Sequence, residues 1–459
     1  MATRSLRHRP QARRKGALAA TALAMATVST LGVGAVPAGA TTRHASSSEP
    51  TASINVWWVT NGTDVNNLWA KIANNFDKAH PGDHVTIEIQ PSSNSYKGKV
   101  LAALATSSPP ALFFSWGGGP MEQYIKAGVI QPFADPGKSD AGNPSWKKDF
   151  LPSSLDAVTF NGKVYGMPIL GTQPVFFFYN KSVFKKVGLS FPKTWPQLLS
   201  DVKTFNSHGI IPIALGNADE WEGLMYLEYL TDRIGGPQAF LNIQANDKGA
   251  WSEPAVQKAL ADIQTLVKDK AFETGYDSIT YTNGSTDALV YKGRAAMQLM
   301  GDWDVGGIES SDPSFIKSGQ LGIGAFPTVP GGRGNPADLE GNTTSYSGLA
   351  KHISKAQTYV AEQFMEYFAT KSYAAQEVPD GQVPVIAGTA GLLKSSSISQ
   401  YLVPIYKAVV KAPYFQYSWD QALGPTKATP MLDNLSKVFE LSETPAQFAA
   451  AMNKYQVAS

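Results

Sequence analysis

The chain has 459 residues, of which 43% are apolar and 17% charged, and it contains no cysteine. This length predicts two or more domains, and the composition is that of a globular protein rather than a disordered one. Without cysteine there is no disulfide, no thiolate metal site and no lipid-modified cysteine to hold the chain at a membrane.

The first forty residues have the three parts of a secretory signal peptide. A head with six basic residues precedes an apolar run at 17–36, and Ala38-Gly39-Ala40 supplies small residues for cleavage. We therefore expect residues 1–40 to be removed near Ala40 and the protein to act outside the cell. The run is long enough to be an uncleaved membrane anchor instead, and Arg13-Arg14 leaves twin-arginine export open.

Cleavage at this point would change the sign of the net charge. Of the 39 Lys and Arg residues, six lie in the signal segment, whereas all 37 Asp and Glu residues lie beyond it. The remaining 33 basic and 37 acidic residues give a net charge of about −4, against +2 for the whole chain. A nucleic-acid partner therefore has no electrostatic support.

After a polar leader at 41–52, strand and helix patterns alternate. The predicted strands are Ser53–Val59, His84–Gln90 and Ala111–Ser115, and the helices between them are Asn66–Ala79 and Tyr96–Thr106. This order predicts an α/β fold with parallel strands. Ligands of such sheets bind at the carboxyl ends of strands, which places Thr60, Asn61 and Trp116 at the mouth of a site.

Trp116 is followed by Gly117-Gly118-Gly119, which lets the backbone approach a ligand closely. A glycine-rich loop can also hold phosphate, but no Lys-Ser/Thr pair follows, so the phosphate interpretation is weak. Trp116 is either a flat platform for a ligand or a packing residue.

The rest of the chain continues the α/β pattern. We expect a hairpin in Phe160–Pro168, a short extended crossing at Leu321–Pro327 and a loop at Pro330–Thr344. The predicted helices are Trp195–Asn206, Trp221–Ile234, Glu253–Lys268 and Ala356–Thr370. No repeat of solenoid period is present.

The segment Val175–Leu198 is the most informative part of the chain. It predicts a buried strand, a short helix ended by Gly188 and a second helix that begins near Trp195. In order and spacing it resembles the central signature of the extracellular solute-binding proteins of sugar ABC importers, the maltose-binding type. The resemblance covers about residues 53–455, and within the signature we expect structural roles for Tyr179 and Asn180.

This resemblance implies a periplasmic-binding-protein-like fold of two α/β lobes, each a mostly parallel sheet flanked by helices. The implied crossings between lobes are near Tyr165–Leu170, Gly322–Thr328 and Pro384–Thr389. The corresponding segments are 53–165 and 323–385 for the first lobe and 166–322 and 386–459 for the second.

The family binds sugar without changing it, so the resemblance implies a binding protein and not an enzyme, with no cofactor and no metal. Its implied partners are a di- or oligosaccharide and the membrane subunits of an ABC transporter, and we expect a monomer. The sequence is similar to binders of xylo-, chito- or gluco-oligosaccharides and does not rank them.

A sugar site needs aromatic platforms for C–H faces and polar side chains for hydroxyl groups. The resemblance assigns platforms to Trp116, to Trp303 in Met297–Asp304 and to Trp419 in Pro413–Gln421, with Asp420 as a hydroxyl acceptor. Further ligand-binding candidates are Trp221, Glu222, Asn61, Asp302, Gln173 and Tyr96.

Each of these clusters also has a purely structural interpretation. Asp302 can cap a helix with Trp303 in the core, and Trp419-Asp420 can belong to an amphipathic helix face. Asp219–Glu222 can be an acidic helix start that is favoured by the helix dipole.

Other functions have less support in the sequence. Paired carboxylates near tryptophan are compatible with a glycosidase, but no motif fixes a pair. No G-x-S-x-G motif indicates a serine hydrolase. His80 and His84 are separated by Pro81-Gly82, which breaks the helix that would align them on a metal. A non-sugar solute such as a polyamine or a peptide remains an alternative ligand.

Overall fold

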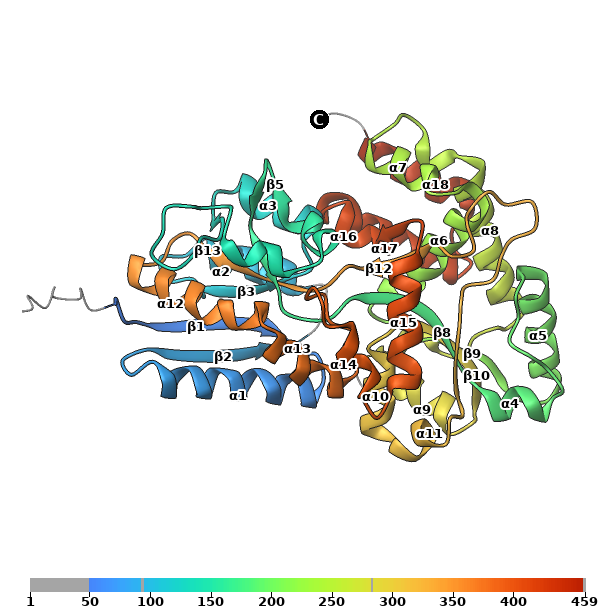
Figure 1. Ribbon diagram of the computed structural model, residues 1–459. Coiled ribbons are helices and arrows are strands. Elements are labelled where there is room, and N and C mark those ends of the chain that lie inside the picture. The colour runs from blue at the N-terminus through green and yellow to red at the C-terminus, as the bar shows by residue number, and fades with distance from the viewer. Residues whose placement is uncertain (1–48, 92–94, 282–283, 457–459) are drawn as a thin grey trace, which may run out of the picture. The chain divides into compact units, whose positions relative to one another are not determined.

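Two mixed β-sheets organise the part of the chain that a computed structural model describes, residues 49–91, 95–281 and 284–456 (Figure 1). The predicted signal segment and residues 41–48 of the leader lie outside the described residues. Within the described ranges, no helix has the length and hydropathy that crossing a bilayer requires.

The first sheet has the strand order β2-β1-β3-β13-β4, with β7 paired to β13. Its strands are β1 (Ser53–Val59), β2 (His84–Gln90), β3 (Leu112–Ser115), β4 (Ile130–Gln131), β7 (Gly166–Pro168) and β13 (Tyr346–Ala350). Strand β1 runs parallel to β2 and β3, whereas β13 runs antiparallel to every strand that it pairs with. The structure confirms the predicted strands Ser53–Val59 and His84–Gln90.

The second sheet has the order β14-β12-β8-β10-β9, with β11 paired to β8. Its strands are β8 (Gln173–Asn180), β9 (Ile211–Ala214), β10 (Ala295–Gly301), β11 (Leu321–Gly324), β12 (Leu339–Asn342) and β14 (Phe415–Tyr417). Strand β8 is antiparallel to β10, β11 and β12. Both sheets are therefore mixed rather than mostly parallel, because β8 and β13 each enter their sheet against the direction of their neighbours.

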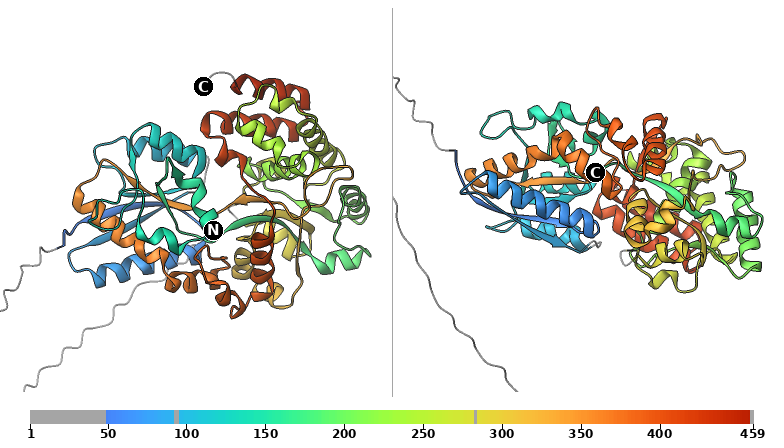
Figure 2. Two further views of the ribbon diagram at one scale, coloured as in Figure 1. Left: turned by 45° about the horizontal axis from the view of Figure 1, so that its top comes forward. Right: turned by 60° about the horizontal axis from the view of Figure 1, so that its bottom comes forward.

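Helices flank both sheets, and each sheet with its helices forms a lobe (Figure 1). Lobe 1 is the first sheet with α1 (Thr63–Ala79), α2 (Ser95–Leu104), α3 (Gly118–Lys126), α12 (Lys355–Glu366) and α13 (Lys371–Glu377). Lobe 2 is the second sheet with α4 (Lys181–Lys186), α5 (Trp195–Ser207), α6 (Trp221–Gly235), α7 (Gln238–Gln244), α8 (Pro254–Lys268), α9 (Ser285–Tyr291), α10 (Asp304–Ser311), α11 (Pro313–Lys317), α14 (Ala390–Lys394), α15 (Ser399–Lys411), α16 (Trp419–Ala422), α17 (Pro425–Phe439) and α18 (Pro445–Asn453). Although α12 lies between β12 and β14 of the second sheet in sequence, it packs on β1, and both views of Figure 2 show it with the blue elements of lobe 1.

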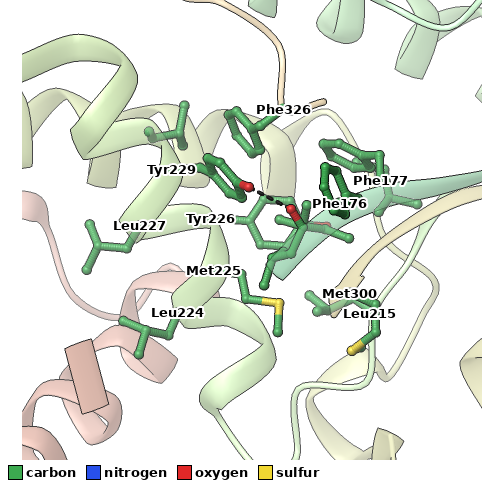
Figure 3. Close-up of a cluster of buried hydrophobic side chains, with 14 of the residues drawn as sticks. Phe176, Phe177, Leu215, Leu224, Met225, Tyr226, Leu227, Tyr229, Met300 and Phe326 are labelled. Carbon is green, nitrogen blue, oxygen red and sulfur yellow. Dashed lines mark hydrogen bonds between the residues drawn. The ribbon is translucent and has the colours of Figure 1, made fainter. Parts of the chain in front are cut away.

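The two lobes have separate hydrophobic cores. In lobe 2, α6 packs across β8, and Figure 3 shows this contact. The ring of Tyr229 lies parallel to that of Phe326, with centroids 4.7 Å apart, and its hydroxyl donates to the carbonyl oxygen of Val175 at 2.6 Å. Burial of apolar side chains on both faces of β8 explains the uninterrupted apolar run in its sequence.

The signature segment folds as predicted, with caps at both of its helices. The carboxamide oxygen of Asn180 accepts from the backbone nitrogens of Ser182 and Val183 and so begins α4. Thr194 and Gln197 form a capping box at the start of α5. The ring of Tyr179 stacks on Phe191, which confirms structural roles for Tyr179 and Asn180.

The predicted hairpin in Phe160–Pro168 is also present. Strands β5 (Thr159–Phe160) and β6 (Lys163–Val164) are joined by Asn161 and Gly162, with φ of 50° and 75°. Positive φ at both central residues is what a type I′ turn requires, and an Asn-Gly pair adopts it readily.

The chain passes between the lobes at three places that lie side by side. It leaves lobe 1 after β7, returns between β12 and β13, and leaves again after α13. The backbone nitrogen of Thr172 donates to the oxygen of Val383 at 2.9 Å, and the hydroxyl of Thr344 donates to the oxygen of Leu170 at 2.6 Å. A Cβ on Gly171 would lie 2.6 Å from the oxygen of Val383, so only glycine permits this approach.

One expected crossing is in the wrong place. We predicted a crossing at Gly322–Thr328, with residues 323–385 in the first lobe, but β11 pairs with β8 inside the second sheet. The chain then forms β12, also in the second sheet, within the segment expected to be a loop, and crosses at 343–345. The short extended pattern of Leu321–Gly324 is the same for an edge strand and a crossing strand, so the sequence did not distinguish them.

Replacing Tyr229 with phenylalanine tests the contact between α6 and β8. The change keeps the stacked ring but leaves the buried oxygen of Val175 without its donor, so we expect the free energy of unfolding to fall by about 1–3 kcal/mol. Urea unfolding measures it. Tyr455→Phe, whose side chain is 46% exposed, is the matched control and should change the value by less than about 0.5 kcal/mol. Equal losses in both variants would contradict the contact's role.

Candidate functional site

A cavity of about 580 Å³ lies between the two lobes and is lined by both of them. From lobe 1 it receives residues that follow β1 and β3, among them Thr60, Asn61 and Trp116. From lobe 2 it receives the starts of α6 and α10. The crossings contribute Gln173, Asn342 and Gln382. The residues predicted to lie at strand ends beside a site therefore border this cavity, where the binding rule for α/β sheets places ligands.

Aromatic rings stand on both sides of this cavity. On lobe 2, the ring centroid of Trp221 is 6.2 Å from that of Trp303 and 5.8 Å from that of Tyr281. On lobe 1, the ring of Trp116 is supported edge-on by Phe114 and Tyr96, at 4.9 Å and 6.0 Å. The three tryptophans are partly exposed, so each keeps ring surface that can contact a ligand.

The position of Trp303 depends on Gly301, the last residue of β10. A Cβ on Gly301 would lie 2.0 Å from the ring of Trp303, so the indole lies directly over the glycine. Any larger residue would push the ring from this position. The Gly-Asp-Trp-Asp sequence is therefore explained by a close approach of ring to backbone.

Two carboxyl groups share one amide behind the aromatic wall. The Nε2 of Gln298 donates to Asp287 at 3.1 Å and to Asp304 at 2.6 Å, and the hydroxyl of Tyr281 donates to Asp304 at 3.3 Å. Burial raises the pKa of both carboxyl groups, and for Asp304 the charge of Asp287 raises it further. Asp287 lines the cavity, so this pair presents both a hydroxyl donor and acceptors to it.

A second polar cluster joins α6 to α16. Glu228 accepts from the backbone nitrogen of Trp419 at 2.7 Å and from the hydroxyl of Ser418 at 2.8 Å. Burial raises its pKa to about 8, although these two hydrogen bonds oppose the shift. Asp420 accepts from Ser418, from Gln421 and, across the cavity wall, from the Nζ of Lys97 at 3.1 Å.

The amino-terminal end of α1 supplies polar groups from lobe 1. The backbone nitrogen of Asn61 donates to the Oδ1 of Asn66 at 3.2 Å, and the Nδ2 of Asn66 donates to the hydroxyl of Thr60 at 2.9 Å. Asp64 and Asp380 also line the cavity here. Burial, and then the charge of Asp64, raise the pKa of Asp380 to about 6.

Six of the ten candidate residues lie in the cavity wall. They are Trp116, Trp303, Trp221, Asn61, Gln173 and Asp420. The structure does not place Trp419, Glu222, Asp302 and Tyr96 there, because all four are buried in the lobe interiors.

Packing and helix geometry explain these four corrections. Trp419 is fully buried and stacks on Phe240, with ring centroids 4.8 Å apart, while its neighbour Asp420 faces the cavity. In the same way Trp221 lines the cavity and Glu222 points into lobe 2, since successive helix residues lie about 100° apart.

The other two residues are held by the backbone. The hydroxyl of Tyr96 bonds to the backbone of Phe114 and Trp57 and ties α2 to the first sheet. The backbone nitrogen of Asp302 donates to the oxygen of Pro174, and the carboxyl group is buried. Neither side chain therefore lines the cavity.

Several lining residues were not found from the sequence. Glu228 and Met225 follow Trp221 at the i+7 and i+4 positions of α6, so the helical period of the candidate Trp221 could have found them. Asp287, Asp380 and Gln382 carry no local motif, because only the packing of α9 and of the third crossing brings them to the cavity. In the described part of the chain, no group of three or more His, Asp or Glu residues has a geometry that could hold a metal ion.

Replacing Glu228 with glutamine tests how much stability the folded protein loses when the buried carboxyl group of Glu228 becomes charged. The pKa of Glu228 is about 8 in the folded protein, above its ordinary value of 4.5. The protonated carboxyl group therefore contributes stability at low pH, and this contribution is lost as the pH rises from about 4.5 through 8. We expect Glu228→Gln to match the wild type at pH 5 and to be more stable by more than about 1 kcal/mol at pH 8.5. Urea unfolding at both pH values measures this. The exposed Glu122→Gln is the control, and an unchanged pH dependence in Glu228→Gln would refute the assignment.

Known proteins share this sequence pattern and fold. Residues 60–375 match the model of the bacterial extracellular solute-binding protein family. The chain is 30% identical over 258 residues to an uncharacterized ABC transporter extracellular-binding protein of Pyrococcus horikoshii, covering 54% of each chain. It is 26% identical over 216 residues to the multiple sugar-binding protein of Streptococcus mutans, covering 46% of this chain and 48% of that protein. It thus spans about half the length of these curated relatives.

A solved structure supports the assignment over a longer range. The structure comes from work on xylan utilization by the thermophilic bacterium Caldanaerobius polysaccharolyticus, and it is 26% identical with a TM-score of 0.79. It covers 88% of this chain and 100% of that one. The two-lobed fold and the family match agree with the resemblance of the signature segment, and the chain belongs to the bacterial extracellular solute-binding protein family.

Proposed function

We propose that this protein is the extracellular sugar-binding component of an ABC importer and that it captures a di- or oligosaccharide between its lobes. The observation that carries the proposal is the cavity itself, which has tryptophan rings on both lobes and carboxyl and amide groups between them. Sugars present C–H faces to aromatic rings and hydroxyl groups to such acceptors. The relative named for sugar binding supports the same ligand class.

In the proposed mechanism the lobes close around the sugar by a hinge motion at the three crossings. Trp116 contacts the ligand from lobe 1, and Trp303 with Trp221 contacts it from lobe 2. Asn61, Gln173 and Asp420 pair with hydroxyl groups. The closed protein then docks on the membrane subunits of the importer, outside the cell and after removal of its signal peptide. We expect the protein to act as a monomer.

A thermal-shift screen against mono-, di- and trisaccharides tests the ligand class. A ligand that binds only the folded state raises the melting temperature by mass action. We expect a rise with at least one oligosaccharide, and chromatography should recover that sugar intact. Release of product would instead establish a secreted carbohydrate-active enzyme. No shift with any sugar would contradict the sugar proposal and favour a non-sugar solute.

Replacing Trp303 with alanine tests the aromatic wall of lobe 2. The change removes stacking surface, so we expect the dissociation constant to rise at least tenfold, or about 1.4 kcal/mol. Calorimetric titration with the sugar found in the screen measures the effect. Trp57→Ala is the matched control, because Trp57 is a partly exposed tryptophan of β1 outside the cavity wall. Unchanged affinity in a folded Trp303→Ala protein would remove Trp303 from the site.

A further inference from the structure

Lys97 joins the two lobes in the wall of the cavity. It lies on α2 of lobe 1, and its Nζ is 3.1 Å from the Oδ2 of Asp420 on α16 of lobe 2. The two side chains are only 15% and 5% exposed. The Nζ also lies 5.4 Å from the ring centroid of Trp116, so the ion pair stands beside one of the proposed stacking platforms.

A second cavity, which we call the rear cavity, also has Lys97 in its wall. It has a volume of about 290 Å³ and lies between α2 and α3 on one side and α17 on the other. Leu101, Leu432 and Ala428 make its walls largely apolar, and Gln123 and Thr429 add polar groups. Among the described lining residues, Lys97 is the one that borders both cavities.

The lobes are in close backbone contact next to Lys97. A Cβ on Gly119 would lie 2.2 Å from the nitrogen of Gly424, and a Cβ on Gly118 would lie 2.5 Å from the oxygen of Gln421. The hydroxyl of Tyr417 donates to the carbonyl oxygen of Trp116. These backbone contacts are close, and the long side chain of Lys97 is the flexible part of the boundary beside them.

Displacing Lys97 while Asp420 stays in place is also energetically costly. Asp420 is held by Ser418 and Gln421, so it stays in place when Lys97 moves. A ligand that displaced Lys97 would leave the carboxylate of Asp420 buried without its cation, unless the ligand replaced it with a donor. A neutral chain that reaches this part of the wall therefore meets the bulk of the Lys97 side chain, which the ion pair holds in place, as a barrier of size.

We propose that Lys97 sets the length of the bound oligosaccharide by closing the cavity at its ion pair with Asp420. This inference rests on the proposed function. The ligand's terminal sugar lies against Trp116 and the ion pair, and the rear cavity is space that the natural ligand does not enter. Lys97 acts here as a residue that determines specificity for chain length.

A series of linear oligosaccharides tests the proposal, with xylo-, chito- and gluco-oligosaccharides of two to six units as probes. In the wild type, the dissociation constant measured by calorimetry should fall with length and then level off. In Lys97→Ala the two cavities join, so one further unit should tighten binding by about tenfold, or 1.4 kcal/mol. The length at which binding levels off therefore moves up by at least one unit.

Lys97→Met separates size from charge. Methionine removes the ion pair but keeps most of the side-chain volume, so this variant should level off at the wild-type length even if all its affinities are weaker. Lys99→Ala is the matched control on the same helix, because Lys99 lies over Trp57 and lines neither cavity. It should reproduce the wild-type profile.

The possible results distinguish failure of the length proposal from failure of the proposed function. An unchanged length limit in a folded Lys97→Ala protein that still binds sugar overturns the proposal and leaves the proposed function standing. The same extension in Lys97→Met as in Lys97→Ala also overturns it, because size would then not be the barrier. If no oligosaccharide binds the wild type, the proposed function fails and the length assignment falls with it.

Discussion

The three chain crossings are the constraint on which the rest of the structure depends. They lie side by side, joined by the hydrogen bonds of Thr172 to Val383 and of Thr344 to Leu170. Gln173, Asn342 and Gln382, which border these crossings or lie on them, also line the cavity. The hinge and the floor of the proposed site are therefore built from the same segments. A ligand that contacts this floor touches the residues whose backbone must rotate for the lobes to close.

Burial decides the chemistry of the cavity wall on lobe 2. Asp287, Asp304 and Glu228 all have raised pKa values with desolvation as the largest cause, so burial makes their charged forms less favourable. A protonated carboxyl group donates and accepts hydrogen bonds without a counter-ion. This environment suits a neutral ligand rich in hydroxyl groups, because such a ligand can satisfy both kinds of bond. The aromatic rings that line the same cavity offer flat surface to the same ligand.

Much of the fold could be predicted from the sequence because its signals are local. β-Branched and aromatic residues identify β1, alternation identifies β2, capping residues identify α4 and α5, and the Asn161-Gly162 pair identifies a hairpin. The crossing after β12 could not be predicted in this way. Leu321–Gly324 has the pattern of any short strand, and its partner β8 lies far away in sequence.

The site shows the same division between local and long-range information. Trp116 could be selected because it follows a predicted strand and Trp221 because it begins a predicted helix, whereas Trp303 was selected through the family resemblance. Trp419 and Glu222 could not be separated from their neighbours Asp420 and Trp221, since the direction of each side chain depends on how α16 and α6 are rotated against lobe 2. Lys97 and Asp380 reach the cavity only through packing between distant segments.

The central claim is that one ligand is held by both lobes in the cavity between them. Amide hydrogen exchange, with and without a saturating oligosaccharide that binds, tests it most directly. The account predicts slower exchange in both lobes at the cavity wall, near Asn61 and Trp116 in lobe 1 and near Trp221 and Trp303 in lobe 2. Protection confined to one lobe, or found only at a surface away from these residues, would contradict it.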